Sequence, residues 1–238
     1  MVLDFTGKVA MVTGGGGGIG EVLCKKFADY GAAVGIVDVN EAQAKRVQQE
    51  IEAAGGKALA LPCDITNEDS VTKTVEALER AFGRVDCLVN CAAVFRGGYL
   101  DEMSLSDWQI PIRVILDGTF LCTKHVLGGM KQRQYGKIVN ICSAAINNPF
   151  LTYGAYAAAK SGLYGYMKTL QEEVRPYKIN VNTLALGLTN TADVKQRATL
   201  PEEEMLQPED VANAITFLCS DEARGFKGSY LEFTGDHV

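Results

Sequence analysis

A run of glycines near the start of the chain is the first feature that could bind a ligand. Residues 13–20 read Thr-Gly-Gly-Gly-Gly-Gly-Ile-Gly and lie between an apolar stretch and the start of a helical pattern. Phosphate groups bind to backbone N–H donors that no side chain blocks, and the start of a helix adds a favourable dipole. This placement predicts a dinucleotide-binding loop rather than a simple flexible turn.

A carboxylate follows at the distance that a dinucleotide fold requires. Asp38 ends the second predicted strand, 24 residues after Gly14, where such folds place the acid that holds the ribose hydroxyls. A carboxylate there repels a 2′-phosphate, and the glycine loop contains no Arg or Lys to receive one. The sequence therefore favours NAD over NADP, unless Asp38 merely ends a strand beside Asn40.

The pattern Tyr-x-x-x-Lys occurs twice, as Tyr156/Lys160 and Tyr164/Lys168. A lysine four residues after a tyrosine lies on the same helical face, so its charge can stabilise a phenolate that accepts a proton from an alcohol. At about 4 Å and an effective dielectric constant of about 20, this attraction is about 4 kcal/mol. The pattern alone is weak evidence, because it arises readily by chance in a chain with nine tyrosines.

The hydrophobic pattern predicts a scaffold of alternating strands and helices for these residues. Short apolar runs predict seven strands, at 8–13, 33–37, 58–61, 86–89, 137–142, 178–184 and 230–233. Amphipathic stretches predict helices at 21–30, 41–54, 67–82, 106–131, 152–175 and 208–218. Pro111 must lie in the first turn of the fourth helix or kink it. We therefore expect one α/β domain over residues 1–238, a Rossmann-type, doubly wound, seven-stranded parallel sheet with helices on both faces.

Composition argues against several other classes of protein. The 238 residues are 47% hydrophobic and 22% charged, with a net charge of −6 and no basic patch to bind nucleic acid. No apolar stretch reaches the length of a transmembrane helix, and the N-terminus does not resemble a signal peptide. The seven cysteines form no Cys-x-x-Cys pair, and only two histidines are present. We expect a cytoplasmic protein with reduced core cysteines, no membrane contact and no metal site.

Taken together, these motifs resemble the short-chain dehydrogenase/reductase family over nearly the whole chain. Tyr156 follows Ser143 by 13 residues, the spacing of the family's catalytic serine and tyrosine. Tyr164 lies roughly 12 Å further along the helix, so we interpret it and Lys168 as packing or surface residues. The resemblance implies that Ser143, Tyr156 and Lys160 are catalytic. It implies cofactor contacts from the residues that match the family's motifs, namely Gly14, Gly18, Ile19, Gly20, Asp38, Asp64, Ile65, Asn90, Ala92, Tyr156, Lys160, Gly187 and Thr191.

The resemblance also implies the reaction, an NAD-dependent interconversion of a secondary alcohol and a ketone by hydride transfer. Tyr156 would exchange a proton with the substrate oxygen, Lys160 would stabilise the phenolate, and Ser143 would orient that oxygen. The substrate is expected to be a moderately apolar small molecule. Its predicted pocket residues are Val94, Phe95, Asn147, Phe150 and Tyr153. The small residues within 152–175, with the resemblance, imply a homo-oligomer, a tetramer or a dimer.

Several positions depart from the family pattern. The family's Asn-Asn-Ala-Gly turn reads Asn90-Cys91-Ala92-Ala93, and its Pro-Gly reads Leu186-Gly187. Ile115 replaces the asparagine that the family uses in a proton relay, and the segment 192–207 is short for a substrate lid. These departures leave two alternatives open. One is a catalytically weak NAD-binding sensor or scaffold subunit. The other is an NADPH-dependent 3-oxoacyl carrier-protein reductase, which Asp38 disfavours.

Overall fold

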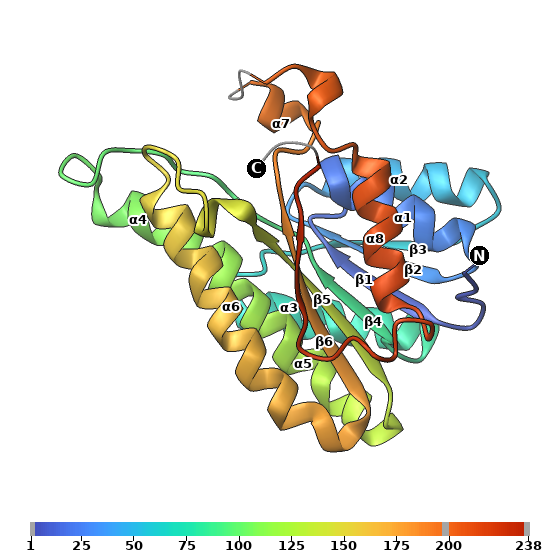
Figure 1. The fold of residues 1–238 in the computed structure, drawn as a ribbon. Coiled ribbons are helices and arrows are strands. Elements are labelled where there is room, and N and C mark those ends of the chain that lie inside the picture. Colours follow the sequence, from blue (N-terminus) through green and yellow to red (C-terminus); the bar gives the residue numbers. More distant parts are fainter. Residues whose placement is uncertain (1–2, 197–199, 236–238) are drawn as a thin grey trace.

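A computed structural model describes residues 3–196 and 200–235, which form a parallel sheet between two layers of helices (Figure 1). The sheet has seven strands in the order β3-β2-β1-β4-β5-β6-β7, and every pair is parallel. The strands are β1 Val9–Thr13, β2 Ala33–Asp38, β3 Lys57–Pro62, β4 Cys87–Asn90, β5 Gly136–Ser143, β6 Ile179–Leu186 and β7 Tyr230–Phe233. This confirms the predicted fold class.

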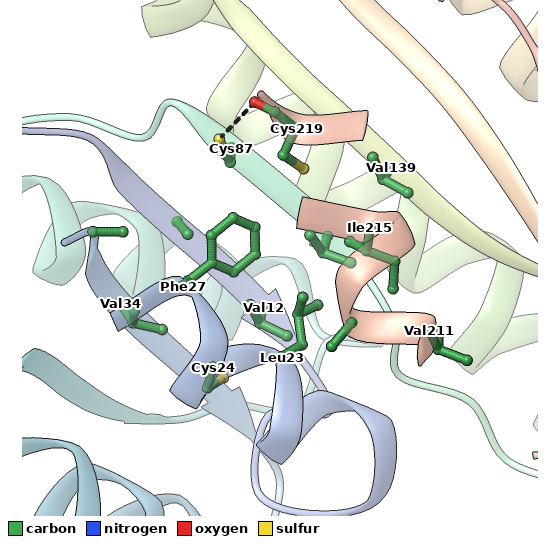
Figure 2. Packing of buried hydrophobic residues seen from close by; sticks show 14 of the residues in the cluster. Val12, Leu23, Cys24, Phe27, Val34, Cys87, Val139, Val211, Ile215 and Cys219 are labelled. Carbon is green, nitrogen blue, oxygen red and sulfur yellow. Dashed lines mark hydrogen bonds between the residues drawn. The ribbon is translucent and has the colours of Figure 1, made fainter. Parts of the chain in front are cut away.

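The two helical layers cover opposite faces of the sheet, because the central strands are apolar on both faces. One core cluster joins the sheet to α1 Gly18–Asp29, α2 Glu41–Ala53 and α8 Pro208–Cys219. The other joins it to α3 Glu68–Phe82, α5 Gly118–Arg133 and α6 Gly154–Val174. Figure 2 shows the first cluster, in which Phe27 and Leu23 of α1 pack near Ile215 of α8.

The cysteines behave as small apolar residues. Six of the seven are buried and all seven are free thiols. Cys24, Cys87 and Cys219 pack within the cluster in Figure 2, where the Cys87 thiol donates to the carbonyl of Cys219 at 3.8 Å. No helix among residues 3–196 and 200–235 combines the length and hydropathy needed to cross a bilayer.

The region predicted as one helix at 106–131 is divided into three segments. α4, Leu105–Pro111, is followed by a π-helical stretch, Ile112–Asp117, and then by α5. Pro111 has no N–H and its ring displaces the preceding turn, so the hydrogen-bond ladder changes register directly after it. Pro111 therefore lies at the end of α4 rather than in its first turn, and the backbone stays right-handed helical at Pro111 and Ile112.

The strand order places a crevice at the carboxyl edge of the sheet. The chain moves outward from β1 through β2 to β3, then returns to β4 and continues outward in the opposite direction. Ligands of open α/β sheets bind where the order reverses in this way. The point of reversal lies between β1 and β4, so the glycine run after β1 and the segment after β4 border it.

Candidate active site

The glycine loop after β1 approaches other backbone too closely for side chains. A Cβ on Gly14 would lie 3.0 Å from the Ala92 Cα, and one on Gly20 would lie 2.1 Å from the Gly14 carbonyl oxygen. Gly14 also has φ +69°, which favours glycine. The Thr13 hydroxyl accepts hydrogen bonds from the backbone N–H groups of Cys91 and Ala92 at 3.0 and 3.1 Å. The loop is thereby attached to the end of β4, and α1 begins at Gly18 within the loop rather than at the predicted Glu21.

Asp38 lies at the end of β2 beside this loop. Its Oδ2 accepts from the Gly16 N–H at 2.9 Å, and its Oδ1 accepts from the Asn40 N–H at 2.9 Å. Each carboxylate oxygen can accept more than one hydrogen bond. Asp38 therefore keeps acceptor capacity for hydroxyl groups at the crevice.

Asp64 and Ile65 follow β3 at the same edge of the sheet. Asp64 is exposed, and its Oδ1 accepts from the Thr66 N–H at 2.9 Å and from the Thr66 hydroxyl at 2.8 Å. Ile65 is buried, and a Cβ on Gly118 would lie 2.7 Å from its Cδ1. Ile65 thus packs on α5 and positions the Asp64 turn.

Asn90 is placed inside the sheet. It is 4% exposed, and its Nδ2 donates to the Asn140 Oδ1 at 2.8 Å and to the Thr123 hydroxyl at 3.3 Å. Asn90 Oδ1 has no hydrogen-bond partner among the described residues. The amide therefore connects the ends of β4 and β5 to α5 below the crevice.

A cleft of about 360 Å³ opens at the carboxyl ends of β4, β5 and β6. Six of the predicted site residues line it, namely Ile19, Ser143, Tyr156, Lys160, Gly187 and Thr191. The remaining predicted residues do not line this cleft; Asn90 and Ala92 lie at the end of β4, and the others follow β1, β2 and β3. The cleft therefore unites the three predicted catalytic residues, whereas most predicted phosphate- and ribose-binding residues lie beside it.

Lys160 is the most buried charge of the cleft, at 2% exposure. Its Nζ donates to the Ile141 carbonyl oxygen at 2.5 Å and lies 5.6 Å from the centre of the Tyr156 ring. Ser143 and Tyr156 are half-buried. They can meet a substrate in the cleft, whereas Lys160 acts from behind Tyr156.

Aromatic rings form one wall of the cleft beside Tyr156. Phe95 lies 6.0 Å from the Tyr156 ring and 4.3 Å from that of Tyr153, between ring centres. Phe150 lies 5.4 Å from Tyr153 and remains 49% exposed. The lining includes Phe95, Phe150, Tyr153 and also Val94, all of which were predicted.

The fifth predicted pocket residue, Asn147, does not line the cleft. Its side-chain amide donates to the Glu232 carboxylate of β7, and Asn148 lines the cleft instead. A short 3₁₀ turn at Ala144–Ile146 sets which of the two asparagines faces inward. Sequence spacing could not distinguish them.

Gly187 and Thr191 come from the segment after β6. A Cβ on Gly187 would lie 2.8 Å from the Thr234 carbonyl oxygen, which explains the need for glycine. The Thr191 methyl carbon lies 3.6 Å from the place of a Cβ on Gly18, so this segment meets the glycine loop. Thr191 also caps α7, Ala192–Lys195, the one α-helix in the described part of the predicted lid at 192–207. Residues 197–199 of that lid lie outside the described residues.

The sequence did not single out Arg46 of α2. Its Nη2 donates to the Gly16 carbonyl oxygen at 3.3 Å and bonds to Glu21 of α1. The contact depends on how α1 and α2 pack, so no spacing in the sequence could have indicated it.

The fold and this cleft define a nucleotide-binding α/β protein with a Ser-Tyr-Lys site. Residues 8–201 match the family model described as short chain dehydrogenase. The chain is 36% identical to the (2S)-[(R)-hydroxy(phenyl)methyl]succinyl-CoA dehydrogenase subunit BbsD of Thauera aromatica, over 96% of this chain and 95% of the relative. It is 34% identical to the 3-oxoacyl-[acyl-carrier-protein] reductase FabG of Aquifex aeolicus (strain VF5), over 99% of each.

A solved structure agrees with these relatives. A 7α-hydroxysteroid dehydrogenase complexed with NADH and 7-oxo glycochenodeoxycholic acid superposes with a TM-score of 0.94 at 31% identity. The match covers 100% of this chain and 96% of that chain. The chain belongs to the short-chain dehydrogenase/reductase family. It is therefore an oxidoreductase that acts on an alcohol or ketone with a nicotinamide cofactor.

Proposed function

We propose that this protein is an NAD-dependent dehydrogenase/reductase that interconverts a secondary alcohol and a ketone, with Tyr156 as the acid–base group. The observation that carries the proposal is the arrangement of the cleft. Ser143 and Tyr156 are accessible there, while Lys160 is 2% exposed behind them. A buried cation next to an accessible phenol suits proton exchange with a substrate oxygen.

The residues at the carboxyl edge fit a nicotinamide dinucleotide. Gly14 and Gly20 leave no room for side chains, so backbone N–H groups at the start of α1 can meet a pyrophosphate. Asp38 would hold ribose hydroxyls. Gly187 and Thr191 border the cleft and would hold the nicotinamide end. When bound, this cofactor supplies the acceptor or donor of hydride.

The chain's own residues then handle the proton. Tyr156 takes a proton from the substrate hydroxyl during oxidation and returns one during reduction. Lys160 favours the phenolate through its charge, and its hydrogen bond to the Ile141 carbonyl keeps the ammonium in place. Ser143 donates to the substrate oxygen and orients it.

The aromatic wall favours a substrate with an apolar ring or chain beside the reacting carbon. Phe95, Phe150 and Tyr153 present this apolar surface next to Tyr156. The name of one relative contains a phenyl-bearing alcohol, and the similar solved structure is complexed with 7-oxo glycochenodeoxycholic acid. We infer a moderately apolar small molecule.

A catalytically weak sensor or scaffold subunit is the second candidate, because Ile115 and Cys91 depart from the family pattern. Turnover with a panel of secondary alcohols separates the two candidates, since a sensor would bind NAD without oxidising any alcohol. The third candidate, an NADPH-dependent carrier-protein reductase, is supported by the FabG relative and opposed by the Asp38 carboxylate.

The cofactor assignment is tested by the affinities of NAD and NADP for the wild type and for Asp38→Ala. We expect the wild type to bind NAD more tightly and the variant to lose that preference. Equal wild-type affinities would refute the NAD assignment.

We also propose a homo-oligomer, a tetramer or a dimer, assembled through α5 and α6. Phe120 on α5 and Tyr164 on α6 are 46% and 38% exposed, and a Cβ on Gly165 of α6 would meet nothing within 4 Å. A face of this kind permits close approach of a second copy. Sedimentation at micromolar concentration tests it, and a monomer would contradict it. The free thiols of all seven cysteines favour the cytoplasm as its compartment.

A further inference from the structure

A guanidinium lies next to the carboxylate that is expected to hold the ribose. Arg46 Nη2 donates to the Gly16 carbonyl oxygen at 3.3 Å, and the Gly16 N–H donates to Asp38 at 2.9 Å. Arg46 and Asp38 thus contact the two backbone groups of one residue in the glycine loop. Arginine is the side chain best suited to bind phosphate, because its planar fork matches two oxygen atoms. Arg46 is therefore close enough to the predicted ribose site to matter for a 2′-phosphate.

All five N–H donors of this guanidinium are already engaged. Nε donates to Gln43 at 2.9 Å. Nη1 donates to Glu21 at 3.0 Å and to Glu50 at 2.8 Å. Nη2 donates to Glu21 at 2.5 Å and to Gly16. A phosphate could bind Arg46 only by displacing one of these acceptors, three of which are carboxylate oxygens.

The charge around Arg46 is also balanced. Lys25 lies 2.7 Å from Glu21 and 2.6 Å from Glu50, so two cations share two carboxylates. The hydrogen bond from Arg46, followed by that from Lys25, lowers the pKa of Glu21 to about 2 despite the opposing effect of burial. Glu21 therefore stays ionised throughout the neutral range, and the cluster offers no net positive charge to an anion.

We propose that Glu21 is a specificity-determining residue, which excludes NADP by occupying the guanidinium of Arg46. This proposal rests on the proposed NAD-dependent function and adds a second contribution to it. Asp38 repels a 2′-phosphate directly, whereas Glu21 removes the cation that would attract one. Replacing Glu21 by Gln leaves two cations facing one carboxylate and removes one of the two oxygen atoms that engage Arg46.

The test measures dissociation constants of NAD and NADP by calorimetry, with no substrate and no turnover. Glu21→Gln keeps the size of the side chain and removes its charge. We expect it to tighten NADP binding about fivefold, the upper end of the effect of one partly exposed charge, and to leave NAD binding within about twofold. Glu52→Gln is the matched control, because Glu52 is an exposed glutamate on α2, the helix of Arg46, and accepts a hydrogen bond from Gln48 rather than from Arg46. It should change neither constant.

The double variant Glu21→Gln/Arg46→Ala identifies the cation responsible. Its NADP affinity should return to the wild-type value, because the attraction depends on the guanidinium. A gain that persists without Arg46, or an equal gain in Glu52→Gln, would overturn the proposal, and so would the absence of any gain. If Glu21→Gln does not fold, Glu50→Gln decides, with an expected gain in NADP affinity of about twofold to threefold.

The dissociation constants of NAD and NADP for the wild type test the proposed function separately. A wild type that prefers NADP refutes the NAD assignment. The role of Glu21 is judged by how the ratio of the two affinities changes between the wild type and Glu21→Gln. The two failures are therefore distinguishable in the same set of titrations.

Discussion

Two copies of the Tyr-x-x-x-Lys motif on α6 have the same local geometry but different tertiary surroundings. In Tyr156/Lys160 the lysine Nζ lies 5.6 Å from the ring centre, and in Tyr164/Lys168 it lies 5.7 Å from it. The local geometry of the two pairs is nearly equal, because both follow from four-residue spacing on one helix.

The tertiary surroundings of the two pairs differ. Lys160 is buried and bonds to a carbonyl of β5, whereas Lys168 is an exposed side chain that bonds to the Gly228 carbonyl at 2.9 Å. Tyr156 lines the cleft, whereas Tyr164 packs edge-on against Tyr230, with ring centres 4.8 Å apart. The four-residue spacing therefore places a cation near a tyrosine twice. Only Tyr156 lies at the carboxyl edge of the sheet, where a substrate in the cleft can reach it.

The largest expected effect separates the two tyrosines. Tyr156→Phe should remove nearly all turnover, a loss of roughly 10²–10⁴-fold, because the substrate oxygen loses its proton partner. Tyr164→Phe is the matched control on the same helix and should keep wild-type turnover. The measurement is kcat at saturating NAD on a confirmed substrate, with NAD affinity unchanged in both. Wild-type turnover in Tyr156→Phe would show that this assignment of the site is wrong.

The lysines give the second comparison. Lys160→Met should lower kcat at saturating NAD, because the Tyr156 phenol loses the buried cation beside it. Lys168→Met is the matched control and should keep wild-type kcat. Steady-state turnover measures both, and an equal loss in both variants would contradict a role that is specific to Lys160.

Ile115 tests whether the core that packs against α6 tolerates the asparagine that the family has at this position. It is 1% exposed within the core cluster that contains α6, so Ile115→Asn should lower the free energy of unfolding by about 3 kcal/mol. We expect no gain in turnover from the restored asparagine. Ile115→Val is the control, with an expected loss of about 1 kcal/mol. Denaturant unfolding measures both, and a faster, stable Ile115→Asn enzyme would contradict the expectation.

The smallest effect concerns the partner of Tyr164. The Tyr230 hydroxyl is buried without a hydrogen-bond partner among the described residues, so Tyr230→Phe should change the unfolding free energy by less than about 1 kcal/mol. Burial, with smaller charge effects, raises the pKa of Tyr230 from 10.0 to about 12.

The raised pKa gives this contact a pH dependence. The unfolded state ionises Tyr230 first, so the stabilisation it confers is complete below pH 10 and is lost as the pH rises toward 12. Thermal unfolding of Tyr230→Phe should therefore be less sensitive to pH in this interval than that of the wild type. Equal sensitivity would show that Tyr230 does not titrate differently in the folded state.

The parts of the fold that could be predicted are those that depend on local sequence patterns. The seven strands, the parallel sheet and the glycine loop follow from hydrophobic period and from residues with restricted backbone preferences, which act over a few positions. Asn67 is an example, because its side chain accepts from the Ser70 N–H and caps α3 at the predicted start of this helix. The resemblance to a family then selected Tyr156 over Tyr164.

Packing decided the rest. Three features depend on elements that meet only in the folded chain: the change to π-helical hydrogen bonding after Pro111, the inward face of Asn148 rather than Asn147, and the binding of Arg46 by Glu21. The sequence by itself determined the order of elements and the identity of the reactive groups, because these depend on residue type and short spacing. Only the tertiary structure decided which cation is buried behind a phenol and which is held by carboxylates, because burial and pairing are properties of the neighbours in space.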